Sequence, residues 1–307
     1  MRPRQLGYIA MDVVDLDVSV RFYQDVAHLE ISEERGGWVY MTGGREHHWL
    51  ALRRKGTRGF NRVAFEMKNP HELEAMEKKL RAAGIEVERA SALSSERVDQ
   101  YIRFRDPEGT TVELFADMVT LPAPPSYAHR VHMDKLLHAV FLVTDVRRTF
   151  SFYSQLLGFR ASDWVERSAV FMRCADRYHH SLALFSSSRP AFDHFCILVP
   201  ALEDVMRARA NALEMEIPMR SDILRHSPSG SIGTYIRDEA NDHAVEFCCN
   251  HARVEDDDDH QPRVLRRMPN VWDAAGPSYQ IRDGARPRKT ANVSVTVATP
   301  DERLSEP

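Results

Sequence analysis

The chain has 307 residues, of which 43% are hydrophobic and 28% are charged, and its formal net charge is −4. This composition is typical of a folded globular protein, and the length suits two domains of ordinary size. The slight acidic excess argues against a nucleic-acid partner, because no surplus of basic residues can neutralise phosphates. The sequence has no apolar run of membrane-spanning length and no signal-peptide pattern at its start. We therefore expect a cytoplasmic protein without membrane or nucleic-acid partners.

Two helix signals and a turn signal organise the first half of the chain. Asp15 can cap a helix whose apolar face ends in Phe22-Tyr23. Apolar residues recur at helical spacing from His71 to Ala83, and Gly84 follows as a helix stop. Asp106-Pro107-Glu108-Gly109 predicts a turn between two strands. Strand-like segments fill the space between these signals.

The same order of elements returns after about 130 residues, which indicates an internal repeat. Asp145 again opens a segment that ends in Phe-Tyr, at Phe152-Tyr153, and Glu203 to Leu213 predicts the second helix of this half. The pair His47-His48 recurs as His179-His180, and the segment 60–65 recurs as 192–197. The two halves therefore look like copies of one domain, and each copy holds two units of a strand, a helix and further strands.

The repeat and the composition together set the expected domain boundaries. We predict an N-terminal domain at 1–120, a proline-rich linker at 121–133 and a C-terminal domain at 134–280. Within the last, the acidic run Glu255–Asp259 is expected to be a solvated loop, and the segment Val264–Tyr279 can wrap back on the body. The tail at 281–307 is polar and is expected to be disordered or to act as an intersubunit arm.

The four cysteines have no repeated spacing; they are Cys174, Cys196, Cys248 and Cys249. Three of them lie in apolar, strand-like segments, and the fourth is a neighbour of one. This pattern predicts reduced thiols, and it favours neither a disulfide framework nor a zinc site.

Three polar residues stand in otherwise apolar strand segments of the second half. They are His138, His194 and Glu246. Two imidazoles and one carboxylate that converge from rigid strands would form a facial triad, which holds a divalent metal and leaves the opposite face open. Taken singly, a strand histidine is more often a hydrogen-bonded core residue, and Glu246 alone could be an edge residue that faces solvent. The combination of all three favours a site for Fe(II), with Mn(II) as the alternative.

The repeat supplies an internal control for this interpretation. Superposing the halves places Tyr8 at the position of His138, Arg62 at that of His194, and Glu113 at that of Glu246. If the fold alone required the histidines, the first half would keep them. Their restriction to the second half favours a function there, and we expect the N-terminal domain to bind no metal.

The segment from His226 to Tyr235, followed by Asp238 and Glu246, resembles a motif of the two-domain, type I extradiol ring-cleavage dioxygenases of the vicinal-oxygen-chelate superfamily. The resemblance covers about residues 5 to 280. It implies an α+β fold in which each domain pairs two βαβββ modules in an open, barrel-like mixed sheet with helices outside. The chain departs from the family in one turn, where residues 238–242 replace the usual Asp-Pro-x-Gly.

The resemblance also implies an activity and roles for residues. The enzyme would be an oxidoreductase of aromatic catabolism that inserts both atoms of O2 into a catechol beside its two hydroxyls, and it would form a homo-oligomer. His180 would be the catalytic acid–base, because an unligated imidazole can take and return a proton near neutral pH; its neighbour His179 is expected to be structural. His226 and Tyr235 would contact the substrate and assist catalysis.

Aromatic residues of the second half could wall the substrate pocket or could equally belong to the core. They are Phe171, Phe185, Phe192 and Trp164. We expect His180 to share a strand face with Leu182 and Leu184, and we expect four other histidines to lie on the surface, namely His132, His243, His251 and His260. Two alternatives stay open: another metalloenzyme of this fold, such as a glyoxalase-like isomerase or a hydroxyphenylpyruvate-type dioxygenase, and a non-catalytic aromatic-binding protein.

Overall fold

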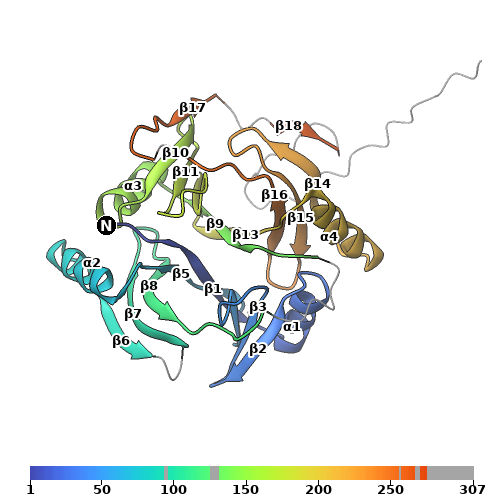
Figure 1. The fold of residues 1–307 in the computed structure, drawn as a ribbon, viewed down its shortest axis with the longest axis horizontal. Helices are drawn as coiled ribbons and strands as arrows, with labels where there is room; N and C mark the ends of the chain where they lie inside the picture. Colours follow the sequence, from blue (N-terminus) through green and yellow to red (C-terminus); the bar gives the residue numbers. More distant parts are fainter. Residues whose placement is uncertain (93–95, 125–130, 256, 267–269, 275–307) are drawn as a thin grey trace, which may run out of the picture.

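The chain folds into two halves that each carry one mixed β-sheet; in Figure 1 the first half is blue to green and the second is green to orange. The computed structural model describes residues 1–92, 96–124, 131–255, 257–266 and 270–274. The predicted linker at 121–133 is therefore described only in part. The tail at 281–307, for which we predict disorder or an intersubunit role, lies outside the described residues.

The first sheet has eight strands in the order β2-β3-β4-β1-β5-β8-β7-β6. In chain order its elements are β1 (Gln5–Val13), α1 (Leu16–Asp25), β2 (Glu30–Arg35), β3 (Trp38–Thr42), β4 (Leu50–Arg54), β5 (Gly59–Glu66), α2 (Pro70–Ala82), β6 (Glu88–Ala92), β7 (Val98–Arg105) and β8 (Thr111–Met118). β1 pairs in parallel with β4 and antiparallel with β5, so two βαβββ modules meet at the β1–β5 pair.

The second sheet repeats this order and adds one short strand at each edge, giving β17-β10-β11-β12-β9-β13-β16-β15-β14-β18. Its elements are β9 (Lys135–Val143), α3 (Val146–Ser151), a π-helical turn (Phe152–Leu156), β10 (Arg160–Val165), β11 (Ala169–Arg173), β12 (Leu182–Ser186), β13 (Ala191–Leu198), α4 (Leu202–Glu214), β14 (Met219–His226), β15 (Ile232–Asp238), β16 (His243–Cys249), β17 (Arg263–Leu265) and β18 (Asn270–Asp273). The expected α+β fold of paired modules in open mixed sheets is confirmed.

The repeat inferred from the sequence is visible in the strand register. Ala64 pairs with Glu113 across the parallel β5–β8 pair, and Cys196 pairs with Glu246 across the parallel β13–β16 pair. Glu113 and Glu246 therefore hold equivalent places in the two sheets. Corresponding residues of the two halves thus lie in the same structural environment.

Side-chain caps explain where the first helix of each half begins. The carboxylate of Asp15 accepts a hydrogen bond from the backbone N–H of Val18 at the start of α1. Asp145 accepts in the same way from Arg147 and Arg148 at the start of α3. Each cap satisfies donors that a helix N-terminus otherwise leaves free, as the sequence predicts. The other two predicted helices correspond to α2 and α4.

The Phe-Tyr pairs of the repeated helices join the two halves. Tyr23 in α1 donates its hydroxyl to Asp238 at the end of β15, at 2.7 Å. Tyr153 in the second half donates to Asp106 in the turn after β7, at 3.0 Å. Because these residues correspond in the repeat, the halves exchange the same buried contact in both directions. The contact between Tyr23 and Asp238 fixes the turn that leads into β16 and Glu246.

Alternation along β9 separates two faces of the second sheet. Ala139, Phe141 and Val143 pack in the large core. Val140 packs in a smaller cluster on the other face, together with Phe171. His138 lies at the alternate positions with Val140, so it is on the face turned away from the large core. This is the face on which the candidate site is built.

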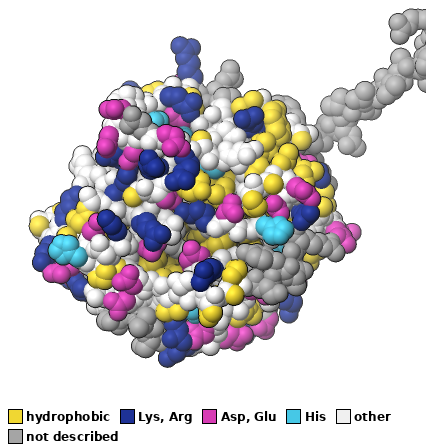
Figure 2. Space-filling model, in the orientation of Figure 1, with side chains coloured by type: hydrophobic (Ala, Val, Ile, Leu, Met, Phe, Trp, Pro, Cys, Tyr) yellow, Lys and Arg dark blue, Asp and Glu magenta, His cyan; other side chains and the backbone are white. Residues whose placement is uncertain are grey.

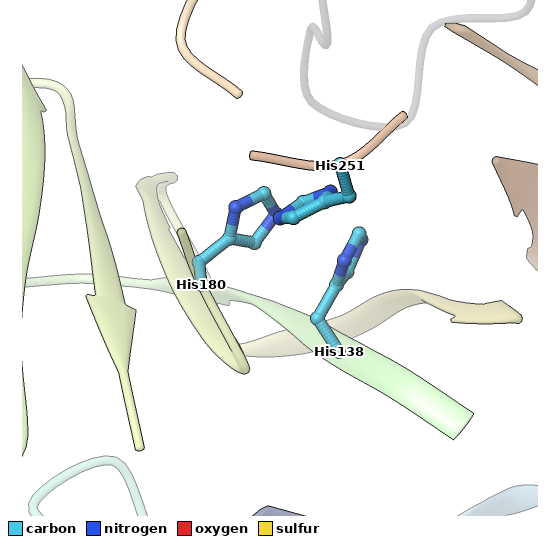
Figure 3. Close-up of side chains that lie close together, drawn as sticks. All are labelled: His138, His180 and His251. Carbon is cyan, nitrogen blue, oxygen red and sulfur yellow. The ribbon is translucent and has the colours of Figure 1, made fainter. Parts of the chain in front are cut away.

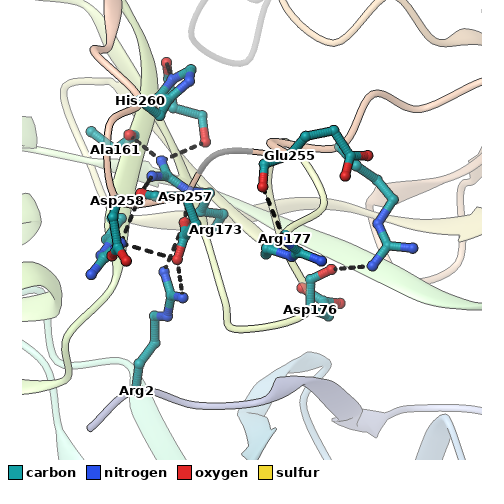
Figure 4. A network of polar contacts seen from close by, with 12 residues as sticks. Arg2, Ala161, Arg173, Asp176, Arg177, Glu255, Asp257, Asp258 and His260 are labelled. Carbon is teal, nitrogen blue, oxygen red and sulfur yellow. Dashed lines mark hydrogen bonds and ion pairs between the residues drawn. The ribbon is translucent and has the colours of Figure 1, made fainter.

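The end of the described chain closes the second sheet and corrects one prediction. β17 pairs with β10, and β18 pairs with β14, so the described residues of the segment Val264–Tyr279 wrap back as expected, and its remaining residues lie outside the described part. The acidic run is not simply solvated. Asp257 accepts a hydrogen bond at 2.6 Å from Nε of the buried Arg173 and also binds Arg2 and Arg160 (Figure 4). A buried guanidinium needs such a partner, which the local charge pattern does not reveal.

Lys and Arg side chains are interspersed with Asp and Glu on the face shown in Figure 2. This mixture agrees with the small net charge and gives that face no broad basic area for a phosphate backbone. Among the helices in the described part of the chain, none combines the length and the apolar character needed to cross a membrane.

Candidate metal centre

One row of side chains crosses four neighbouring strands of the second sheet. Cys196 in β13 pairs with His138 in β9 on one side and with Glu246 in β16 on the other. Tyr235 in β15 is the next residue of the row, opposite Glu246. His194 lies two residues before Cys196 and therefore points to the same face. Rigid strands thus bring all three predicted ligands together.

The two imidazoles converge on a single carboxylate oxygen. Oε2 of Glu246 lies 3.0 Å from Nε2 of His138 and 3.3 Å from Nε2 of His194. All three side chains are buried, while Oε1 of Glu246 and Nδ1 of His138 have no hydrogen-bond partner. Imidazole nitrogens and a carboxylate with unused acceptor capacity are the ligand types that divalent transition metals take in proteins.

The charges of this group follow from burial and mutual contact. Burial alone would raise the pKa of Glu246, but attraction by His138 and hydrogen bonds from the surrounding histidines hold that pKa well below its usual value. Burial lowers the pKa of His138, and Glu246 offsets only part of this. Burial would also lower the pKa of His194, yet hydrogen bonds to Asp193 and Glu246 raise it. A bound metal would therefore have to displace the proton of His194.

His194 has an outer partner that fixes its orientation. Its Nδ1 lies 2.5 Å from Oδ2 of Asp193, and Oδ1 of Asp193 accepts from Arg220 at 2.7 Å. A carboxylate on Nδ1 makes this nitrogen the donor and leaves Nε2 to face Glu246, which is the arrangement that usually supports metal-binding histidines. Strand patterning does not reveal this role of Asp193, although Asp193 directly precedes His194.

The first half shows what the same carboxylate does without a metal-binding set. Oε2 of Glu113 accepts from Arg103 at 2.6 Å and lies 3.3 Å from Nε of Arg62, while Oε1 accepts from Tyr8 at 2.5 Å. Two guanidinium groups thus neutralise the buried charge. In the described part of the second half, no guanidinium bonds to the carboxylate of Glu246. Among the described residues, the centre thus has no permanently charged partner of this kind, and its donor set fits a divalent metal.

His180 borders the centre and is held by a chain of hydrogen bonds. Its ring centroid lies 4.2 Å from that of His138, and its Nδ1 lies 3.0 Å from Nδ1 of His179. Nε2 of His179 lies 2.8 Å from Oδ2 of Asp163. Burial would raise the pKa of Asp163, but hydrogen bonds from His179 and Arg263 lower it, so Asp163 is an anion that can only accept.

This chain sets the tautomers of both imidazoles. Burial lowers the pKa of His179 and of His180, so both rings are neutral at neutral pH. His179 donates from Nε2 to Asp163, and its Nδ1 must then accept from Nδ1–H of His180. The lone pair of His180 is therefore on Nε2, where it can accept a proton.

The predicted strand position of His180 is wrong, although the ring reaches the centre. β12 begins at Leu182, so the alternation of that strand does not extend back to His180. Leu182 and Leu184 lie in the large core, whereas His180 contacts His138 and Phe171. His179 is not merely a residue on the opposite face, since it is the hydrogen-bond partner of His180.

His226 lies near the other oxygen of Glu246 and also contacts Tyr235. Nε2 of His226 is 2.8 Å from the Tyr235 hydroxyl and 3.5 Å from Oε1 of Glu246. The Tyr235 ring packs edge-on against His194, with centroids 5.1 Å apart. Burial raises the pKa of Tyr235 well above its usual value, so the phenol keeps its proton and can donate it in a hydrogen bond.

Residues 5–114 and 135–247 both match the family described as the Glyoxalase/Bleomycin resistance protein/Dioxygenase superfamily. An iron-dependent extradiol dioxygenase of Rhodococcus jostii is 30% identical over 214 residues, which cover 63% of this chain and 71% of that protein. The chain belongs to the extradiol dioxygenases of this superfamily. The resemblance predicted from the segment 226–246 is thereby confirmed.

One further relative and one solved structure match most of the length of this extradiol dioxygenase. The 1,2-dihydroxynaphthalene dioxygenase of Sphingobium xenophagum is 26% identical over 263 residues, or 80% of this chain and 84% of that protein. The crystal structure of the Mn(II)-bound glyoxalase from Novosphingobium aromaticivorans superposes with a TM-score of 0.79 at 24% identity, over 86% of this chain and 87% of that chain. The similarity to the glyoxalase structure shows only that the two proteins share a fold.

The four aromatic residues predicted to wall a substrate pocket do not all lie together, and Trp164 packs against Phe150, with centroids 4.8 Å apart. Phe171 packs against His180, with centroids 4.9 Å apart, and against Phe185 at 5.8 Å. Phe192 instead stacks on Phe60 of the first half at 4.6 Å and contacts Phe141. In this extradiol dioxygenase, Phe171 and Phe185 are thus on the His180 side of the centre, whereas Phe192 lies where the two halves meet.

Two histidines that we expected on the surface are buried. His243 contacts the Tyr23 hydroxyl at 2.9 Å, and His251 lies beside His180 (Figure 3). Asn250 adopts a φ of 58°, which turns the chain after β16 and carries His251 back over the sheet. An Asn directly after a strand is a turn signal that could have suggested this return.

Proposed function

We propose that this protein opens the aromatic ring of a catechol beside its two hydroxyl groups, with Fe(II) held by His138, His194 and Glu246. The supporting observation is the approach of two buried Nε2 atoms to one oxygen of Glu246, a carboxylate that no guanidinium neutralises among the described residues. Mn(II) is the alternative ion, since the same ligand types accept it. One relative above is named iron-dependent, and one similar structure contains Mn(II).

When bound, such an ion would hold catechol and O2 together and pass electron density between them. The chain itself would supply proton transfer and orientation. His180 takes a hydroxyl proton at Nε2, because its Nδ1–H is donated to His179. On the other side of Glu246, His226 donates from Nε2 to the Tyr235 hydroxyl, and that hydroxyl donates its own hydrogen to a substrate oxygen as negative charge develops there.

We propose a two-ring catechol as the preferred substrate. A relative that covers most of the chain is named for 1,2-dihydroxynaphthalene. Phe171 and Phe185 form an aromatic pair next to His180, and such a pair favours a second ring by edge-to-face contact. One-ring catechols with an alkyl or carboxyl substituent serve as the comparison set.

The test uses protein prepared without oxygen and loaded with Fe(II). 1,2-Dihydroxynaphthalene, 2,3-dihydroxybiphenyl and substituted one-ring catechols are added before air is admitted. We expect uptake of one O2 per catechol and a coloured ring-fission product. His180→Gln should lower kcat by roughly 10²- to 10⁴-fold while iron stays bound, because only the acid–base group is removed. The proposal fails if iron-loaded protein takes up no O2 with any of these catechols.

A glyoxalase-like isomerase is the second candidate, because the Mn(II)-bound glyoxalase shares the fold over most of the chain. Isomerisation of a hemithioacetal needs no O2, so an anaerobic assay separates it from ring cleavage. A protein that only sequesters an aromatic would bind catechol without consuming O2. Homo-oligomeric assembly in the cytoplasm stays a prediction, and sedimentation of the purified chain tests its first part.

A further inference from the structure

Three buried histidines meet at the edge of the candidate centre with no carboxylate among them (Figure 3). His138 comes from β9, His180 from the segment before β12, and His251 from the turn after β16. Each offers one ring nitrogen, and these three atoms lie within 4.8 Å of one another. The centroid of His180 lies 4.2 Å from that of His138 and 4.6 Å from that of His251.

Two nitrogens of this cluster lack a hydrogen-bond partner. Nε2 of His251 and Nδ1 of His138 are buried and form no hydrogen bond. Nδ1 of His180 is engaged by His179, which leaves Nε2 as its donor atom for a ligand. A buried polar atom without a partner destabilises the fold, so a ligand that engages these nitrogens would recover this free energy.

The first half provides a comparison within the same fold. His48 corresponds to His180 and pairs with His47 through Nδ1 atoms 3.1 Å apart. Its neighbour is the ring of Tyr8, 4.3 Å away, where the second half has His138. The paired histidines thus occur in both halves, whereas the three-imidazole cluster occurs where His138 and His251 are added.

We propose that His138, His180 and His251 form a second metal site, selective for Zn²⁺, that competes with the iron centre for His138. Zn²⁺ takes three imidazoles in a tetrahedral site and leaves the fourth position open. A set of nitrogens without a carboxylate favours Zn²⁺ over Fe(II), which binds such ligands more weakly. Tetrahedral zinc needs nitrogens about 3.3 Å apart, so the rings must close by up to about 1.5 Å.

The two sites exclude each other because they share one ring. A neutral imidazole has a single lone pair, so His138 cannot serve one metal through Nε2 and another through Nδ1. Zinc in the three-imidazole site would take His138 from the iron centre and occupy Nε2 of His180. The existence of the zinc site does not depend on the proposed function, but its effect as an inhibitor of ring cleavage does.

The test measures zinc affinity in full-length, metal-free protein by competition with a chromophoric chelator. Glu246→Ala removes the carboxylate of the iron centre and should retain one equivalent of Zn²⁺. Adding His251→Phe to this variant should weaken zinc binding at least tenfold, whereas adding His194→Phe should change it less than threefold. Thermal unfolding of each variant verifies that it is folded before its affinity is compared.

Co²⁺ supplies a second readout that does not depend on activity. In Glu246→Ala we expect the intense visible absorption of four-coordinate Co²⁺, and we expect it to disappear when His251→Phe is added. His48→Phe, at the corresponding place in the first half, should leave the spectrum unchanged. The proposal is overturned if His194→Phe abolishes zinc binding and His251→Phe does not, or if Glu246→Ala binds no zinc. If the wild-type protein cleaves no catechol, the zinc affinities and the Co²⁺ spectra still test the zinc site.

Discussion

Replacing Asp193 with Asn tests whether the metal centre depends on the outer partner of His194. Asp193 is buried, with Oδ2 at 2.5 Å from Nδ1 of His194 and Oδ1 at 2.7 Å from Arg220. The substitution keeps the size of the side chain and removes its charge. The first half already has Asn61 at the corresponding position, so the fold accepts an amide there.

Two effects of Asp193→Asn can be estimated separately. Loss of the carboxylate behind a metal-binding histidine typically weakens metal affinity 10- to 100-fold, which is about 1.4–2.7 kcal/mol. We expect the upper part of this range, because the hydrogen bond to His194 is buried and charge-assisted. The protein should also lose roughly 1–3 kcal/mol of stability, since the buried guanidinium of Arg220 then faces a neutral amide.

The assay is anaerobic competition for Fe(II) or Mn(II) between the protein and a chromophoric chelator. Glu96→Gln is the matched control, because Glu96 binds Arg62 at 2.7 Å in the first half. It should lower stability without changing metal affinity. If Asp193→Asn binds the metal within threefold of wild type, or if Glu96→Gln weakens binding as much, the role assigned to Asp193 is wrong.

Three further predictions concern proton transfer, stability and metal removal. Asp163→Asn should lower kcat roughly 10- to 100-fold with metal affinity unchanged, because His180 loses control of its tautomer; steady-state kinetics and metal analysis check this. The pKa of Asp257 falls from 3.8 to about 2 on folding, since hydrogen bonds from Arg2 and Arg173 outweigh its burial. The ionised carboxylate of Asp257 therefore stabilises the fold above pH 4, and this stabilisation is lost as the pH falls toward 2. In urea unfolding, Asp257→Asn should have a free energy of unfolding about 1–2 kcal/mol below that of wild type at pH 7, and the difference should disappear near pH 2. Chelation of a metal present at 100 times its Kd should remove about 2.7 kcal/mol of stability and lower Tm by about 5–10 °C in calorimetry.

The sequence predicts the parts of the site that lie on repeated strands. His138, His194 and Glu246 interrupt apolar alternation, and the repeat assigns each a counterpart, so their convergence follows once β9, β13 and β16 are neighbours. The partners that come from elsewhere in the chain are not predictable in this way. Asp163 reaches His179 from β10, and His251 returns through a turn, so neither position follows from strand periodicity.

The duplication shows how one fold yields a first half whose buried carboxylate is paired with arginines and a second half with a candidate metal centre. Both sheets bury a carboxylate at the same place, and an isolated buried carboxylate is costly unless a positive charge accompanies it. The first half supplies that charge from its own side chains, because Arg62 and Arg103 both bind Glu113. In the second half, imidazoles surround Glu246, and they provide a full positive charge only when protonated. A divalent metal satisfies the same electrostatic requirement and also leaves coordination positions for ligands, which a guanidinium cannot do. The half with the structural ion pairs and the half with the candidate catalytic centre therefore differ by two replacements around the carboxylate: Arg62 corresponds to His194, and Arg103, opposite Glu113, corresponds to Tyr235, opposite Glu246.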